Sequence, residues 1–215
     1  MENLRRLFDN NRALVEQVTR DEPDFFMRRA GKQEPHFLFI GCADSRVPLE
    51  TLTGALPGEM FVHRNIANQV LTADLNVLSV LQYAVDVLDV EHVIVCGHYQ
   101  CGGVKAAMGD ESYGLVDHWL AGIRDQVRRH QSELEAYPTD GQRFNRVVEL
   151  NVLRQVYNLS RTPIVQSAWR RGRRPMLHGI VYDLHDGLLK QLVLQVDGQD
   201  KVRAFLEADR RGVGV

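Results

Sequence analysis

Three short apolar runs, separated by segments long enough for helices, limit what this chain can fold into. They are Phe37–Ile40, Met60–His63 and His92–Gly97. Short, uninterrupted apolar runs are typical of strands buried on both faces, as in a parallel sheet. Between the second and third runs, Asp74 has the character of a helix N-cap and precedes an apolar helical stripe that reaches Leu88. The alternation predicts βαβ crossovers and an α/β fold with a mainly parallel central sheet flanked by helices.

The start of the chain has a helical pattern. Residues 4–18 carry apolar side chains at helical spacing, and a second, shorter helix is expected from Pro23 to about Gly31. We therefore predict an N-terminal helical arm over residues 1–31. The apolar stripe of its first helix is large for a terminal segment, so we expect it to pack on another subunit.

The C-terminal half changes its period. Residues 115–160 are mostly helical in pattern, with breaks expected at Tyr137-Pro138 and around Gly141. The segments Met176–Asp183 and Leu189–Val196 instead alternate, and they flank an Asp-Gly pair that is a strong hairpin signal. We predict a C-terminal antiparallel hairpin. No repeat or linker divides the sequence, so a single domain over residues 1–215 is expected.

Composition excludes several classes of protein. The 215 residues include 26 Lys and Arg against 28 Asp and Glu, a formal net charge of −2. Binding to phosphates needs a basic excess, so a nucleic-acid partner is not expected. The most hydrophobic region, residues 70–95, is interrupted by acidic side chains, which argues against a membrane span. Three cysteines and no secretory signal indicate a reducing, cytoplasmic location.

Two of the predicted strands are followed by residues whose side chains can bind a metal or take part in a reaction. Cys42, Asp44 and Arg46 follow the first strand, and His98 and Cys101 follow the third. Ligands of open α/β sheets bind at the carboxyl ends of the strands. We therefore expect the two segments to meet at one end of the sheet.

Two thiolates and one imidazole form a ligand set typical of zinc. With an open fourth position, Cys42, His98 and Cys101 would make a catalytic site, whereas a fourth protein ligand would make a structural one. Asp44 could be that fourth ligand, but Arg46 offers it a bidentate partner away from the metal. The remaining cysteine, Cys96, lies inside an apolar strand and is interpreted as a core residue.

At these residues the chain resembles the β-class carbonic anhydrases. The resemblance covers residues 42–48, 57–65 and 97–103, and extends to residues 149–152, 166–169 and 178–179. It implies one Zn²⁺ per chain on Cys42, His98 and Cys101, with Asp44 and Arg46 as the catalytic pair. The implied reaction is reversible hydration of CO2 to bicarbonate and a proton, by attack of zinc-bound hydroxide. It further implies that the Gly102 N–H helps to position the substrate, and that the chains form dimers or dimers of dimers.

The resemblance is to a bacterial subgroup of this family that can close its site. In that subgroup the residue equivalent to Asp44 leaves the arginine and ligates zinc, and bicarbonate binds a separate pocket of Trp, Arg and Tyr that stabilises the closed form. Here Arg64 and Tyr182 match that pocket, but Phe39 replaces the tryptophan. Because a phenyl ring has no N–H donor, the pocket's hydrogen bonding is expected to be weaker.

Two other functions are compatible with these motifs. Relatives with the same fold hydrolyse carbon disulfide or carbonyl sulfide, and a different substrate tunnel would not alter the motifs. A non-enzymatic zinc or redox-sensing protein would have Asp44 fixed on the metal. Arg46 argues against the second alternative, because a permanent structural site needs no competitor for its fourth ligand.

Overall fold

The structure is a computed structural model that describes residues 2–172 and 174–210. By its internal contacts the chain forms two compact units, one up to Glu34 and one from Pro35 onward. The first contains α1 (Glu2–Asp21) and α2 (Phe25–Ala30). The two expected helices are thus present, although α2 begins later than predicted because Pro23 lies in a turn and Asp24 takes the N-cap position.

No residue of α1 is buried. Its exposed apolar side chains include Leu4, Leu7, Phe8, Leu14 and Val15. The contact of this stripe with another subunit stays a prediction, as does the interpretation of residues 1–215 as one domain. Met1, at the start of the expected arm, lies outside the described residues.

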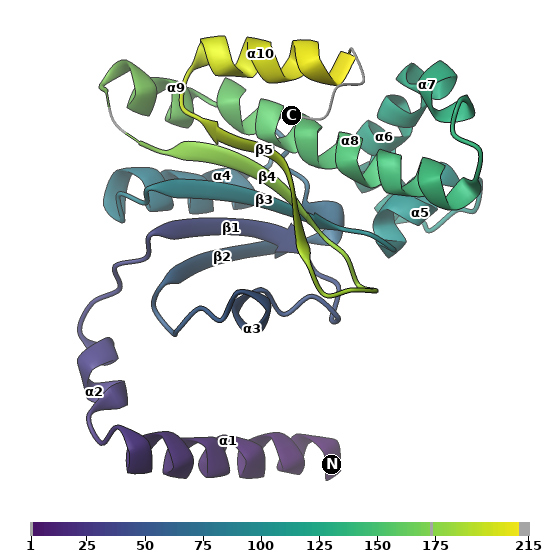
Figure 1. Cartoon of the computed structure of the whole chain (residues 1–215). Helices are drawn as coiled ribbons and strands as arrows, with labels where there is room; N and C mark the ends of the chain where they lie inside the picture. The colour runs from purple at the N-terminus through teal and green to yellow at the C-terminus, as the bar shows by residue number, and fades with distance from the viewer. Residues whose placement is uncertain (1, 173, 211–215) are drawn as a thin grey trace. The chain divides into compact units, whose positions relative to one another are not determined.

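The second unit is built on a five-stranded sheet in the order β2-β1-β3-β4-β5 (Figure 1). β1 (Phe37–Cys42) pairs in parallel with both β2 (Met60–Asn65) and β3 (His92–His98), and β3 pairs in parallel with β4 (Met176–Tyr182). Only β5 (Leu189–Val196) is antiparallel, through the predicted hairpin. The predicted fold class is confirmed.

Successive residues of β1 pack against opposite faces of the sheet. Leu38 and Ile40 belong to the larger core, which includes residues of α4 (Leu75–Gln82) and α8 (Asp140–Arg161). Phe39 belongs to a smaller core shared with α3 (Leu49–Thr53). Burial on both faces explains why this strand has no polar alternation in sequence.

Helix α8 approaches the sheet closely because two strand positions are glycine. A Cβ on Gly97 of β3 would lie 2.6 Å from Val152, and one on Gly179 of β4 would lie 2.9 Å from the same side chain. Either distance is far inside normal carbon contact, so a larger residue would force the helix away from the strands. α8 can therefore pack directly against β3 and β4.

The remaining helices complete the second unit. They are the short η1 (Ile66–Asn68), a π-helical segment η2 (Tyr83–Val87) that continues α4, α5 (Gly102–Met108), α6 (Leu115–Arg129), α7 (Gln131–Glu135), α9 (Pro163–Arg170) and α10 (Gln199–Arg210). None of the helices in the described ranges is long and apolar enough to cross a membrane.

Two local expectations compare directly with the structure. Asp74 caps α4 as predicted, its side chain accepting the N–H of Asn76 at 2.9 Å. The break expected around Gly141 is wrong, because α8 already begins at Asp140. Thr139 caps α8 by accepting the N–H of Gln142, so Gly141 lies within the first helical turn.

Candidate metal centre

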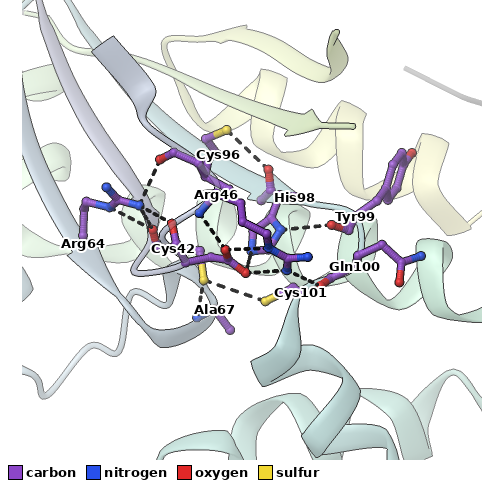
Figure 2. Close-up of polar contacts among 12 residues, drawn as sticks. Cys42, Arg46, Arg64, Ala67, Cys96, His98, Tyr99, Gln100 and Cys101 are labelled. Atoms are coloured by element: carbon purple, nitrogen blue, oxygen red, sulfur yellow. Dashed lines mark hydrogen bonds and ion pairs between the residues drawn. The ribbon is translucent and has the colours of Figure 1, made fainter. Parts of the chain in front are cut away.

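The structure brings together the three side chains that the sequence analysis assigned to a metal. Cys42 is the last residue of β1 and His98 the last residue of the adjacent β3, while Cys101 precedes α5. Their ligand atoms all lie within 4.8 Å of one another, and all three side chains are buried (Figure 2). Parallel pairing of β1 with β3 is the reason why residues so distant in sequence converge.

His98 is oriented for coordination. Its Nδ1 lies 3.0 Å from the carbonyl oxygen of Tyr99, so Nδ1 carries the proton and Nε2 presents a lone pair. That Nε2 is buried and has no hydrogen-bond partner among the described residues. A buried acceptor of this kind is satisfied by a metal ion, so the side chains fit a divalent cation.

The two thiols share one environment. Cys42 Sγ and Cys101 Sγ are 3.8 Å apart, and the backbone N–H of Ala67 donates to Cys42 Sγ at 3.4 Å. The hydrogen bond between the two thiols lowers the pKa of Cys42 and raises the pKa of Cys101, so one of the two loses its proton more readily than the other. The second proton is therefore released only when a cation offsets the added charge, which matches a Zn²⁺ site.

Asp44 lies beside the cluster but is held by Arg46. Arg46 donates from Nε to Asp44 Oδ1 at 2.9 Å and from Nη2 to Oδ2 at 2.7 Å, and its backbone N–H also reaches Oδ1 at 2.9 Å. Oδ2 is nevertheless only 3.7 Å from His98 Nε2. The Arg46 hydrogen bond is the main reason why the pKa of Asp44 is lowered to about 2, so the carboxylate stays ionised.

The side chain of Arg64 binds backbone oxygens of the loop that carries Asp44. The guanidinium donates to the carbonyl oxygens of Cys42, Asp44 and Val47, at distances from 2.7 to 2.9 Å. Phe39 and Tyr182 lie in the smaller core together with Val47. Of the three residues of the expected effector pocket, Arg64 thus bonds backbone oxygens of this loop (Figure 2), and Phe39 and Tyr182 are core residues.

Two further predicted positions have clear locations. Gly102 is the first residue of α5, where a backbone N–H has no partner within the helix. Cys96 is buried and donates to the carbonyl oxygen of Gly97 at 3.3 Å, and burial raises the pKa of its thiol to about 12. It is absent from the ligand cluster formed by the described residues, which agrees with its interpretation as a core residue.

Sequence reasoning missed the residues around Ala67, which contact the ligand Cys42 through the backbone. Ala67 and Asn68 both have positive φ, of 61° and 46°. Glycine is the usual sequence signal for such a conformation, and here neither residue is glycine. Asn68 alone gave a weak signal, since asparagine tolerates the left-handed region better than other residues.

Comparison with known proteins identifies the family. The family model described as carbonic anhydrase matches residues 37–189. A carbonic anhydrase of Emericella nidulans is 47% identical over 193 residues, which cover 90% of this chain and 85% of that protein. One from Candida albicans is 36% identical and covers 90% of this chain and 69% of that protein.

The solved structures that this chain resembles belong to the same family. A Coccomyxa β-carbonic anhydrase in complex with acetazolamide aligns with a TM-score of 0.88 and 38% identity, over 96% of this chain and 95% of that chain. A tetrameric β-carbonic anhydrase of Sordaria macrospora aligns at 0.85 with 36% identity, over 89% and 98%. Because the family model, the similar proteins and the cysteine–histidine–cysteine cluster all agree, the chain belongs to the β-class carbonic anhydrases.

Proposed function

We propose that this chain catalyses the reversible hydration of CO2 to bicarbonate and a proton, with one Zn²⁺ held by Cys42, His98 and Cys101. The observation that carries the proposal is the buried cluster of three ligands beside a carboxylate that Arg46 holds off the fourth position. A structural zinc site would use that carboxylate as a ligand. An arginine that binds it instead favours an exchangeable fourth position.

Zinc at this site supplies a Lewis acid that lowers the pKa of a coordinated water and so provides a nucleophile. The side chains present supply the rest. Asp44, ionised because its pKa is low, can only accept hydrogen bonds, so it would orient the attacking oxygen by accepting a hydrogen bond from the O–H of that oxygen. Arg46 fixes Asp44 by two hydrogen bonds, and the Gly102 N–H is available to one oxygen of CO2.

The same geometry supports a site that can close. Asp44 Oδ2 is 3.7 Å from His98 Nε2, so Asp44 would be close enough to serve as a fourth ligand if Arg46 released it. Arg64 would have to exchange backbone oxygens of the Asp44 loop for bicarbonate if Phe39, Arg64 and Tyr182 form an effector pocket. Bicarbonate would then shift the equilibrium toward the closed state by binding that state better.

We also propose that the protein works as a dimer or a dimer of dimers in the cytoplasm. The exposed apolar stripe of α1 needs a cover, and the Sordaria relative is described as tetrameric. The matched relatives include fungal, bacterial and plant proteins, so the assignment to a bacterial subgroup stays a prediction.

Stopped-flow CO2 hydration, with zinc measured in the same sample, tests the proposal. The wild type should hold about one zinc per chain, and Cys101→Ser should lose both zinc and activity. Cys96→Ala is the matched control, since Cys96 is buried outside the ligand cluster and its loss should leave zinc content unchanged. Full zinc occupancy in Cys101→Ser, or a zinc-loaded wild type that hydrolyses carbon disulfide without hydrating CO2, would contradict the proposal.

A further inference from the structure

The backbone around Ala67 has an unusual conformation at a point that touches a metal ligand. Ala67 has φ 61° and ψ 32°, and Asn68 also has positive φ. Residues with a Cβ avoid the left-handed region, and they remain there only where the surroundings hold them. The conformation directs the Ala67 N–H at Cys42 Sγ, 3.4 Å away (Figure 2). A costly backbone conformation therefore supplies one specific donor to one thiolate.

A row of amide side chains on α8 holds this segment, which comprises residues 65–70 and is called the 65–70 turn below. Asn151 Nδ2 donates to Ala67 O at 3.0 Å. Gln155 accepts the N–H of Val70 at 2.9 Å, and Asn158 donates to Val70 O at 2.8 Å. Residues 151, 155 and 158 share one face of a helix, so the row is a continuous clamp along α8.

Asn151 is the member of this row that acts on Ala67. It is about 1% exposed, and its Oδ1 accepts from Gln155 Nε2 at 2.8 Å, which leaves its Nδ2 directed at Ala67 O. Hydrogen bonding of the side chain therefore fixes which end of the amide faces the turn. Among these three amides, only Asn151 bonds the residue that donates to Cys42.

The opposite side of the turn is also closely packed. A Cβ on Gly103, two residues after the ligand Cys101, would lie 2.7 Å from Ile66 Cγ2 and 3.2 Å from Ala67 Cβ. The turn is thus confined between the loop that carries Cys101 and the amides of α8. A change in the position of Ala67 would be felt at Cys42 and at the segment that follows Cys101.

We propose that Asn151 is a positioning residue for the metal centre, which holds Ala67 in its left-handed conformation so that the Ala67 N–H donates to Cys42 Sγ. The inference rests on the proposed zinc site. Hydrogen bonds to ligating atoms orient them and tune the metal, and removal of such partners typically weakens metal binding by about 10- to 100-fold. Asn151 acts one bond further out, so the expected loss is about tenfold.

The test compares zinc binding in Asn151→Leu and Asn158→Leu. Both substitutions remove an amide that bonds the 65–70 turn, but only the first removes the bond to Ala67. By competition with a chelator, the zinc dissociation constant should be about tenfold higher in Asn151→Leu than in the wild type, and within twofold of the wild-type value in Asn158→Leu. If Asn151→Leu does not fold, Asn151→Asp replaces it, because this variant keeps the shape and loses the donor.

A second readout reports on the sulfur itself. In the Co²⁺-substituted protein, loss of the N–H donor should move the thiolate-to-cobalt charge-transfer band to longer wavelength, because electrons on an unbonded sulfur are easier to transfer. Glycine adopts positive φ without penalty, so Ala67→Gly added to Asn151→Leu should recover part of the zinc affinity.

The inference would be overturned if an Asn151 variant that folds kept the wild-type zinc affinity and charge-transfer band. It would also be overturned if Ala67→Gly recovered no zinc affinity in the double variant. A wild type that binds no zinc would instead overturn the proposed metal centre, so the two failures are distinguishable.

Discussion

A histidine pair at the end of the sheet remote from the metal centre should make stability depend on pH. His92, at the start of β3, and His178 of β4 are in contact, with His92 Nδ1 3.0 Å from His178 Nε2. The backbone N–H of Gln195 donates to His178 Nδ1 at 3.2 Å, so Nδ1 is an acceptor and the single proton of neutral His178 lies on Nε2. Protonation of His178 would place a second proton against the Gln195 N–H.

Burial, together with the neighbouring His92, lowers the pKa of His178 from 6.5 to about 4. Glu91 lies 3.9 Å from His92 Nε2, and it is itself paired with Arg174. These charges face His92 rather than His178, so they give little support to a cation at His178. His178 is 9% exposed, which limits screening by solvent.

The sign of the effect follows from linkage. Because the folded pKa lies below the unfolded value of 6.5, the unfolded chain binds a proton more readily. The stabilisation is complete above pH 6.5 and is lost as the pH falls toward 4. For these two pKa values the loss is about 2 kcal/mol at pH 5 and about 3 kcal/mol below pH 4.

Chemical denaturation of the zinc-loaded protein at pH 7.5 and pH 5.0 measures this loss. Acid also weakens zinc binding, so His178→Gln, which cannot titrate, provides the reference. The free energy of unfolding should fall by about 2 kcal/mol more in the wild type than in His178→Gln between the two pH values. Parallel decreases in the two proteins would refute the assignment of this pH dependence to His178.

Three other predictions address the catalytic site and the assembly. Asp44→Asn should keep zinc but lose most CO2 hydration. Arg46→Ala should be nearly as harmful, because it frees Asp44 for the fourth position. Stopped-flow turnover at the wild-type level in Arg46→Ala would contradict the functional pairing of the two residues. The rate of CO2 hydration should be low near neutral pH and rise above about pH 8. Inhibition by bicarbonate at low pH should be stronger in Phe39→Trp than in the wild type. Equal inhibition of the two proteins from pH 6.5 to 9 would show that residue 39 is not part of an effector site. Light scattering at micromolar concentration should give a dimer or tetramer, against a monomer mass of 24.5 kDa.

The convergence of the ligands was predictable from sequence because it follows from local patterns. Apolar runs define β1 and β3, and parallel pairing brings the residues after both strands to one end of the sheet. The adjacency of Asp44 and Arg46 along the chain likewise predicts their ion pair, which is present. The sequence analysis makes no prediction for residues 199–210, which form α10.

Contacts between distant segments could not be predicted in this way. Asn151 and Ala67 are 84 residues apart, and their hydrogen bond depends on how closely α8 approaches the sheet. That approach depends in turn on glycines at positions 97 and 179, whose role becomes visible only when the neighbouring Val152 is located. The sequence contains all of these residues but no periodic pattern that relates them.

The two arginines at the site control one loop through different groups. Arg46 binds the side chain of Asp44 and also donates to the carbonyl oxygen of Gln100 at 3.2 Å, which ties the Asp44 loop to the loop that carries Cys101. Arg64 binds the backbone of the Asp44 loop. A ligand that draws Arg64 away would loosen the loop without touching Asp44, so an effector could influence the fourth metal position through Arg64 while Arg46 still competes for the carboxylate. If the site closes as proposed, Arg46 and Arg64 would act on that equilibrium separately, and each can be substituted independently of the other.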